Sequence, residues 1–543
     1  GGMAAQKNPL LPCFKNESTE VSWHGALEAS VFIGTLNVLG NAKNPIEFCP
    51  HNFQDAGFCA AEASLWEAFS SITFSDVLAE VSKPILPKME AYIGEIIRQD
   101  DGPADKDSPV YPSIHTKVVD VNLDNKVLAN VGRVNPIILG MEPLPAAASR
   151  SGGGAAAVGD DKRCTAAYAV AAEVPDGNDC VLRLINSFYN GVLAGESKLD
   201  YPDNQLMALM VWDLMCTLTA RRDPAAFDFV CRASYQIDAE SGIPRDADAG
   251  TKLLFKHAAQ VADRSPLVPA IIAVQETPSD LLERVGFDRG FTMQYSPNAG
   301  ANLGFLFRGC KLVGDVTNDP KHDFPATWHK FLNPQVPEKL ANKVKTTIRR
   351  VHICVFALPD GKNVAAINIH ISPFENPEVL GAFFGFVSTT VAEALGVPTL
   401  ILSDTNVDSK WGKSLNTFES QKAALEAQSH IGLLPEALMT IPRQLEKGLL
   451  NESAELKLYP DIGTVTTIKM RSRFQAQTHK ASQLVACTRD LLVLPADVEV
   501  LAYEVGLAPS EAELSSSLDL MLPAAFWPAD HFAVFALCKV NRR

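Results

Sequence analysis

The sequence predicts an α/β protein in which layered β-sheets are flanked by helices, and three observations lead to this expectation. From residue 265 onward, short apolar runs bounded by turn residues recur, which is typical of buried strands. Helical stretches such as 378–396 lie between these runs, and the alternation favours sheets with helices on their faces. With 543 residues and 47% hydrophobic content, the chain can bury a large core and form more than one unit.

The expected elements can be followed along the chain from its N-terminal part. The first strand is the apolar run 29–40. Mostly helical spacing follows over 58–100 and 178–262, and the Ala/Gly/Ser-rich stretch 144–161 between them is typical of a flexible loop. The further expected strands are "LVPAIIAVQET", "ANLGFLFRG", "VHICVFALP", "VAAINIHIS", "PTLILSDTN", "RDLLVLP" and "HFAVFALCKV".

Composition excludes several classes of protein. The net charge of −15 argues against a protein that coats duplex DNA through charge alone. Eleven cysteines without a C-x-x-C pair fit reduced thiols in a cell rather than a disulfide framework or a zinc site. No basic start leads into an apolar run, and the apolar stretch 205–220 contains Asp213 and is short for a membrane span. We therefore expect an intracellular protein, cytoplasmic or nuclear, with no secretory signal and no membrane span.

Several of the expected strands begin or end with a polar side chain that can bind a metal ion or a phosphate group. A single polar strand end is an ordinary turn, whereas six in one chain favour a shared pocket at one edge of the sheets. Carboxylates, amides and imidazoles in such a pocket suit a hard divalent cation and a phosphate ester. These residues are Asn37, Glu276, His370, Asp404 with Asn406, Asp490, and Asp530 with His531.

The order and spacing of these segments resemble the endonuclease/exonuclease/phosphatase superfamily. The matching segments, in the order of the family, are "TLNVL" with Asn37, Gln275-Glu276, "ANLGFLFR" ending at Arg308, Asn368 with His370, "SDTN", Arg489-Asp490 and "ADH". The resemblance covers 29–40 and about 265–543. It implies the DNase I-like four-layer α/β sandwich, in which two packed mixed β-sheets are flanked by helices.

Three departures from the family pattern stand out. Ser403 replaces the usual Gly, and Ala529 replaces the usual Ser. A long stretch also separates Asn37 from Glu276, where the family needs one helix and a loop. We therefore expect 20–40 to hold the first strand of the catalytic domain, 41–250 to be a mostly helical insertion, and 251–543 to be the rest of the catalytic domain. The insertion is also a possible binding region for a protein partner.

The resemblance implies a role for each site residue. Glu276, with Asn37 and Asp530 close by, would bind Mg²⁺ or Mn²⁺, which polarises a phosphoryl oxygen. Asp404 would activate the attacking water, and Asn406 would hold that water or the phosphate because positions i and i+2 of a strand point the same way. The remaining catalytic residues are His531, which contacts the phosphoryl oxygen, Asp490, which orients His531, and His370, which donates to the phosphate.

A basic segment and one further arginine are candidate substrate contacts. The stretch 464–481 contains Lys469, Arg471 and Arg473 and is expected to form a loop before the strand that begins at Asp490. Such side chains would meet an anionic substrate, and Arg308 is a further candidate from its motif. The alternative is that these charges are only solvated surface.

The resulting hypothesis is a divalent-metal-dependent phosphodiesterase that acts on nucleic acid, namely a single-stranded RNA or DNA nuclease. The N-V-L after Asn37 is similar to deadenylases, "DTN" to tyrosyl-DNA phosphodiesterases, and "NV" after the aspartate to AP endonucleases, so the branch stays open. The alternatives are a phosphomonoesterase acting on an inositol phosphate or nucleotide, and a catalytically silent binding protein. The inositol 5-phosphatase patterns "GDLNYR" and "P-x-W-C-D-R" do not occur.

Overall fold

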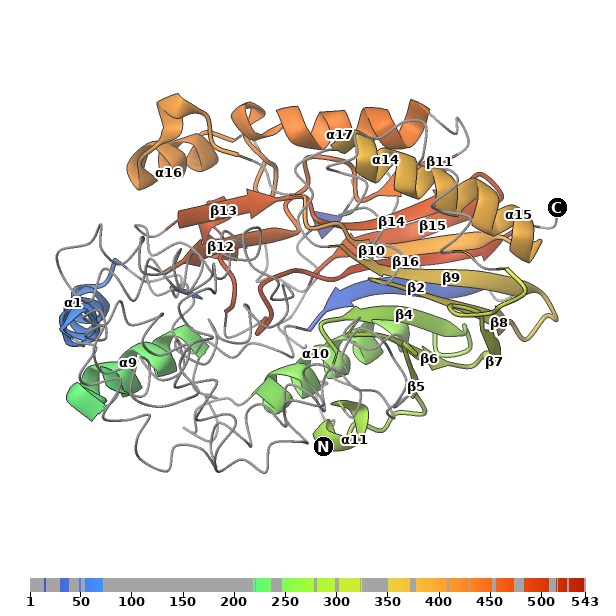
Figure 1. Ribbon diagram of the computed structural model, residues 1–543, viewed down its shortest axis with the longest axis horizontal. Helices are drawn as coiled ribbons and strands as arrows, with labels where there is room; N and C mark the ends of the chain where they lie inside the picture. The colour runs from blue at the N-terminus through green and yellow to red at the C-terminus, as the bar shows by residue number, and fades with distance from the viewer. Residues whose placement is uncertain are drawn as a thin grey trace, which may run out of the picture.

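Two mixed β-sheets form the centre of the molecule in this computed structural model (Figure 1). The structure describes residues 14–15, 30–38, 48–49, 54–71, 218–219, 221–235, 247–277, 281–297, 302–322, 324, 350–371, 377–407, 410–428, 430–451, 456–472, 483–506, 514, 516–524 and 527–541. The strand order of the seven-stranded sheet is β1 (Phe14–Lys15), β15 (Val498–Val505), β16 (Val534–Val540), β2 (Ser30–Asn37), β4 (Ala270–Gln275), β6 (Leu303–Arg308) and β5 (Thr292–Tyr295).

The second sheet has six strands, and a smaller third sheet lies beside the two large ones. The order of the six-stranded sheet is β11 (Leu456–Tyr459), β14 (Asp490–Pro495), β10 (Thr399–Asp404), β9 (Asn363–His370), β8 (Val351–Ala357) and β7 (Lys311–Asp315). The three-stranded sheet has the order β13 (Gln483–Cys487), β12 (Thr467–Arg471) and β3 (Phe48–Cys49).

Helices cover the outer faces of the two large sheets. The α-helices among the described residues are α1 (Ala56–Ser70), α9 (Pro224–Tyr235), α10 (Ala247–Ala262), α11 (Leu281–Val285), α14 (Pro377–Phe386), α15 (Ala392–Leu395), α16 (Phe418–Glu426) and α17 (Thr440–Asn451). A π-helical turn, η3 (Val387–Val391), joins α14 to α15, and the short 3₁₀ turns are η4 (Lys413–Leu415), η5 (Glu436–Leu438) and η7 (Ser517–Leu520). Helix α10 lies on one side of the sandwich, and α14 and α17 lie on the other (Figure 1).

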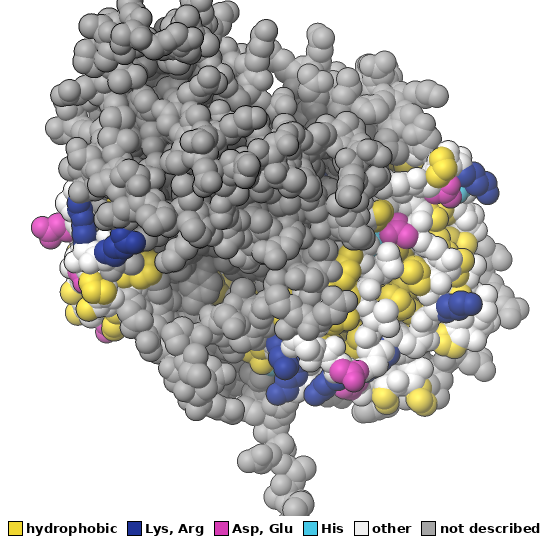
Figure 2. Space-filling view, turned by 60° about the horizontal axis from the view of Figure 1, so that its bottom comes forward, with side chains coloured by type: hydrophobic (Ala, Val, Ile, Leu, Met, Phe, Trp, Pro, Cys, Tyr) yellow, Lys and Arg dark blue, Asp and Glu magenta, His cyan; other side chains and the backbone are white. Residues whose placement is uncertain are grey.

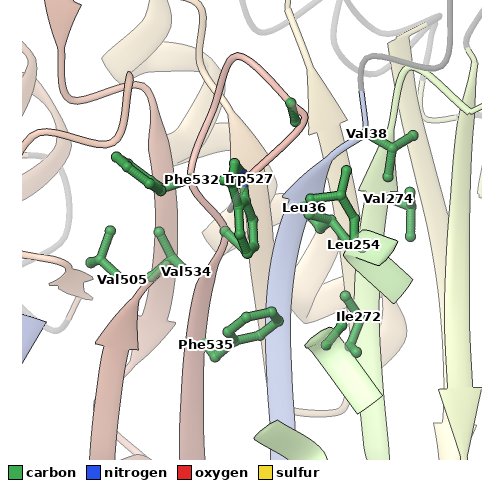
Figure 3. Packing of buried hydrophobic residues seen from close by; sticks show 14 of the residues in the cluster. Leu36, Val38, Leu254, Ile272, Val274, Val505, Trp527, Phe532, Val534 and Phe535 are labelled. Atoms are coloured by element: carbon green, nitrogen blue, oxygen red, sulfur yellow. The ribbon is translucent and has the colours of Figure 1, made fainter. Parts of the chain in front are cut away.

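The core lies in three interfaces of this stack. Strands β2 and β4 pack against β9 and β10, which joins the inner faces of the two sheets. Leu254 of α10 packs with Leu36 and Ile272 on the outer face of the first sheet (Figure 3). Phe383 of α14 packs with Ile401 on the outer face of the second sheet. The central strands are therefore buried on both faces, which requires the nearly continuous apolar runs seen in the sequence.

This stack of helix, sheet, sheet and helix confirms the four-layer α/β sandwich that the sequence predicts. The predicted strand runs appear as β2, β4, β6, β8, β9, β10, β14 and β16. The helix expected over 251–262 begins earlier, at Ala247. Of the predicted insertion 41–250, the structure describes β3, α1, α9, the start of α10 and a few residues before α9; the expected loop 144–161 lies outside the described residues.

The prediction of a loop over 464–481 is wrong for its first part. Residues Thr467–Arg471 form β12, which pairs with β13 on one side and with β3 on the other. The charge of Lys469 hides this strand in the sequence, because a lysine inside a strand pattern usually marks an exposed position.

Among the described residues, none of the helices has the length and apolar character that a membrane crossing requires.

Gly34 provides a test of the close packing between β2 and β16. A Cβ at Gly34 would lie 2.5 Å from the ring of Phe535, which stacks on Phe32 and cannot move aside easily. We expect Gly34→Ala to lower the free energy of unfolding by about 1–3 kcal/mol, as overpacking usually does. Gly314→Ala is the matched control, because a Cβ there meets nothing within 4 Å. Equal urea midpoints for the two variants would contradict this packing.

Candidate active site

The strand ends that carry the predicted site residues meet at one edge of the sandwich. Strands β2 and β4 are parallel, and Asn37 lies beside Gln275. Strands β9 and β10 are also parallel, with His370 beside Asp404, and antiparallel β14 places Asp490 on the other side of Asp404. Because β2 packs against β10 and β14, both sets of strand ends share one edge.

The amide of Asn37 joins the two sheets at this edge. Its Nδ2 donates to Glu276 Oε1 and to Asp404 Oδ2, each at 3.0 Å. His370 Nε2 lies 3.7 Å from the same two carboxylate oxygens. Gln275, the residue before Glu276, adds a second buried link between the sheets, because its Nε2 donates to Asn368 Oδ1 at 2.8 Å. The base candidate and the metal-ligand candidate are therefore held on one amide.

Glu276 lies in a strained turn directly after β4. Its φ is 54°, in the left-handed region that residues with a Cβ rarely adopt. The next residue, Thr277, donates its N–H to the carbonyl of Asn302 at 2.9 Å, which holds the turn. Backbone strain of this kind concentrates at functional sites, where the surrounding structure enforces it. The side chain of Glu276 keeps 26% of its surface exposed and can reach a ligand.

The residues predicted to bind a metal ion fit a hard divalent cation. Burial, and next the charge of Asp530, raise the pKa of Glu276 to about 7. Within the part of the chain that the structure describes, Asp530 Oδ1 is a buried oxygen with no hydrogen-bond partner. A cation held by both carboxylates would remove their repulsion and satisfy this oxygen, and Mg²⁺ and Mn²⁺ prefer such oxygen ligands.

His531 sits among three carboxylates and one guanidinium. Its Nδ1 lies 3.1 Å from Asp490 Oδ2 and 3.5 Å from Asp404 Oδ2, and its Nε2 lies 3.2 Å from Arg489 Nη1. Burial alone would lower the pKa of His531, but the charges of Asp490, Asp404 and Asp530 together raise it. The three carboxylates thus favour the protonated ring, whose Nδ1 faces Asp490 and whose Nε2 faces Arg489.

The carboxylates of the site differ in their readiness to ionise. For Asp404, burial is outweighed by His531, His370, Arg489 and Asn37, which lower its pKa. For Asp490, burial, and next Asp404, raise the pKa to about 6 against the attraction of His531. For His370, burial is the largest cause that lowers the pKa to about 4, so the ring is neutral at pH 7. Asp404 is therefore ionised at neutral pH, as a proton acceptor must be.

Asp404, Asp490 and His531 also bring ligand atoms within 4.8 Å of one another. This group fits a metal ion less well than Glu276 with Asp530, because a protonated Nδ1 that donates to Asp490 has no lone pair for a metal ion.

Asn406 reaches the site in a different way from the one predicted. Strand β10 ends at Asp404, so Asn406 lies beyond the strand. The rule that side chains at i and i+2 of a strand point the same way therefore does not apply to it. Instead Asn406 has a φ of 48°, and its backbone N–H donates to Asp404 Oδ1 at 2.9 Å. Asparagine tolerates this left-handed backbone better than most residues. The segment is therefore a turn, and this turn orients Asp404.

Among the predicted substrate contacts that the structure describes, Lys469 forms an ion pair with a residue of the cluster. Lys469 is 1% exposed and pairs with Asp530, so the prediction of an accessible loop lysine is wrong. Arg308 lies beside Ala270, at the opposite end of β4 from Gln275, because β6 runs antiparallel to β4. There Arg308 pairs with Asp263 at 2.8 Å.

For two arginines of the basic segment, substrate contact stays a prediction. Arg471 ends β12, and Arg473 lies outside the described residues. On the face shown in Figure 2, the basic side chains of the described residues are scattered and form no continuous field.

Arg489 is a site residue to which the sequence reasoning assigned no role. It is 2% exposed, and its position directly before Asp490 was the available signal.

The structure accommodates the residues that depart from the family pattern at positions 403 and 529. Ser403 is buried and donates to the carbonyl of Leu491 at 3.0 Å, and Ala529 is buried in the core.

A second group of possible metal ligands lies on β7 and β8. His352 Nε2 is 2.9 Å from Asp315 Oδ2 and 3.3 Å from Cys354 Sγ. If Nε2 bound a metal ion, its proton would move to Nδ1, which has no hydrogen-bond partner within the described ranges. This group is therefore better described as a buried histidine that donates to Asp315.

No family model matches the chain, and no curated protein matches it in sequence. Among solved structures, the chain is similar to D. rerio TDP2 complexed with a single strand DNA product, at 10% identity over 56% of this chain and 96% of that one, with a TM-score of 0.30. It is also similar to ANGEL2, a 2′,3′-cyclic phosphatase, at 15% identity over 55% of this chain and 87% of that one, with a TM-score of 0.29.

A third similar structure is the human Nocturnin catalytic domain with bound sulfate, at 15% identity over 53% of this chain and 85% of that one, with a TM-score of 0.24. At such identities and TM-scores, these likenesses carry no argument by themselves. The fold rests on the strand order, and the candidate site rests on the contacts given above.

The raised pKa of Glu276 predicts how stability depends on pH and on metal. This pKa rises from 4.5 to about 7 on folding, so the stabilising contribution of the protonated form is complete below about 4.5 and is lost as pH rises through about 7. In EDTA, Glu276→Gln should therefore melt higher than the wild type at pH 8, with the difference vanishing toward pH 4.5.

Added Mg²⁺ should raise the melting temperature of the wild type at pH 8 and leave that of Glu276→Gln nearly unchanged. Differential scanning fluorimetry across this pH range, with and without the metal, measures both effects. An equal response of the two proteins to Mg²⁺ would remove Glu276 from the metal site.

Proposed function

We propose that this chain is a divalent-metal-dependent hydrolase of phosphate esters, and that its substrate is a phosphodiester bond of single-stranded RNA or DNA. The observation that carries the proposal is the pairing of ionised Asp404 with His531 at 3.5 Å, beside Glu276. Attack on phosphorus needs a base for the water, a cationic donor for the phosphoryl oxygen and a hard cation. These three functions are adjacent here.

Asp404 acts on the attacking water. The water oxygen bonds to phosphorus, its proton passes to the Asp404 carboxylate, and the bond to the leaving oxygen breaks, after which solvent protonates that oxygen. Asn37 and the N–H of Asn406 each hold one oxygen of this carboxylate, so it is oriented before substrate arrives. Such preorganisation avoids the cost of reorienting groups during the reaction.

His531 and Arg489 bind the phosphoryl group. Arg489 Nη1 and His531 Nε2 lie 3.2 Å apart, so both groups can reach one anionic oxygen placed beside them. A phosphoryl oxygen at this position accepts hydrogen bonds from both donors, while Asp490 holds the imidazole from its other side. Glu276 and Asp530 would hold a Mg²⁺ or Mn²⁺ ion, which would supply Lewis acidity and further charge neutralisation at the phosphoryl group.

A second candidate function is supported by the burial of the cations. Arg489 and His531 are each 2% exposed, and both lie within the cluster instead of along an open face. Such placement suits one compact, highly charged phosphate group, as in a nucleotide or an inositol phosphate. The catalytically silent alternative is less well supported, because Asp404, Glu276 and Asn37 are bonded together in one cluster.

A substrate panel with Mg²⁺ and with Mn²⁺ tests the proposal. Oligo(A), mixed single strands, abasic duplex, phosphotyrosyl DNA, nucleotides and inositol phosphates are incubated with the full chain, and products are resolved by gel and by phosphate release. We expect cleavage of single strands that EDTA abolishes. Release of phosphate from nucleotides or inositol phosphates alone selects the second candidate, and no product from any of them refutes both.

Replacement of Asp404 separates catalysis from folding. Asp404→Asn keeps the shape of the side chain but removes the proton acceptor, so kcat should fall by about two to four powers of ten while KM is nearly kept. His531→Ala should cause a similar loss, and the double variant should lose far less than the product of the two. Exposed Asp461→Asn is the matched control and should leave kcat unchanged. A folded Asp404→Asn protein with near-normal turnover would reduce this segment to a structural turn.

A further inference from the structure

Lys469 is a buried lysine in the centre of the candidate site. It lies in the middle of β12, opposite Val485 of β13, and is 1% exposed. Its Nζ donates to Asp530 Oδ2, and the ring of Phe48 in β3 covers it at 5.6 Å. A fully buried ammonium group is retained only where a charge or strong hydrogen bond compensates it. Asp530 provides that compensation.

The two oxygens of Asp530 have different surroundings. Oδ2 bonds to Lys469, and His531 Nε2 lies 3.8 Å away from the same oxygen. Oδ1 is buried and, within the described residues, has no hydrogen-bond partner. A divalent cation can therefore share Oδ1 with Glu276, whereas an approach to Oδ2 would bring it against an ammonium group. Like charges at such a distance in a buried site repel strongly.

We propose that Lys469 takes the place of a second metal ion, so that the site holds one divalent cation, at Glu276 and Asp530 Oδ1. Two-metal phosphoesterase sites place a second ion about 3.5–4 Å from the first to stabilise charge on the opposite side of the phosphate. Here the ammonium group of Lys469, bonded to Asp530 Oδ2, is a covalently attached positive charge. Lys469 acts through Asp530 and is a positioning residue. This inference rests on the proposed metal-dependent function.

The segment that covers Lys469 comes from the region between β2 and β4. Strand β3 pairs Cys49 with Met470 and Phe48 with Arg471, which are the residues directly after Lys469. Phe48 thereby shields the ammonium group from solvent and adds a cation–π contact. Desolvation strengthens the attraction between Lys469 and Asp530, which favours a permanent pair over exchange with a free ion.

The number of bound ions tests the inference without any turnover. Isothermal titration of the metal-free full chain with Mn²⁺ alone should show one ion for the wild type. Lys469→Met removes the charge at similar volume and should raise the count to two, with a first Kd that falls on the order of tenfold because a repelling charge is lost. Lys469→Arg should keep one ion, and exposed Lys457→Met is the matched control that should also keep one.

Two ions in the wild type, or one ion with unchanged Kd in a folded Lys469→Met protein, would overturn the inference. If Lys469→Met does not fold, the number of Mn²⁺ ions bound by the wild type tests the single-ion site. Failure of the proposed function looks different, since a chain that binds one Mn²⁺ but hydrolyses nothing leaves the role of Lys469 intact. Hydrolysis whose rate rises with the square of Mn²⁺ concentration would support the function and refute the single-ion site.

Discussion

The amide of Asn37 is the interaction on which the candidate site depends. Asn37 is fully buried, and a buried amide without hydrogen-bond partners would destabilise the folded state. Its bonds to Glu276 and Asp404 satisfy the amide, and they hold the two sheets in register at this edge. Both acceptors are carboxylates, and hydrogen bonds to charged groups are the stronger kind. The packing of the core therefore sets the distance between Glu276, the candidate metal ligand, and Asp404, the candidate base, because the two come from different sheets.

The second constraint is the balance of buried charge around that amide. An isolated charge in such an environment is unfavourable by several kcal/mol, and the carboxylates of Asp404, Asp490 and Asp530 lie beside His531 or Lys469. The partners also separate the carboxylates by function: the pKa values of Asp404 and Asp530 are lowered, chiefly by His531 for the first and by Lys469 for the second, whereas burial raises that of Glu276. Environments that push pKa values apart assign different roles to chemically identical groups.

The region between β2 and β4 contacts the candidate site, because Phe48 of β3 covers Lys469. Its first strand, β3, extends the β12–β13 hairpin, and α9 contacts β3 while α1 packs on α9 (Figure 1). Movement of these elements would reach Lys469 through Phe48, and from there Asp530. The binding of a protein partner by this region stays a prediction, since the structure describes only part of it.

By itself the sequence determined the α/β class, the eight main strands and most site residues. Apolar runs report burial locally, and parallel strands bring residues such as Asn37 and Glu276 to one edge, so strand ends could be interpreted without coordinates. Only the tertiary structure decided the place of Lys469, whose burial depends on Asp530, 61 residues away. It also decided that Arg308 faces away from the site, because that depends on the direction of β6, and that Asn406 acts through its backbone. The pairing of strands and of buried charges arises between distant segments, and a local pattern does not encode it.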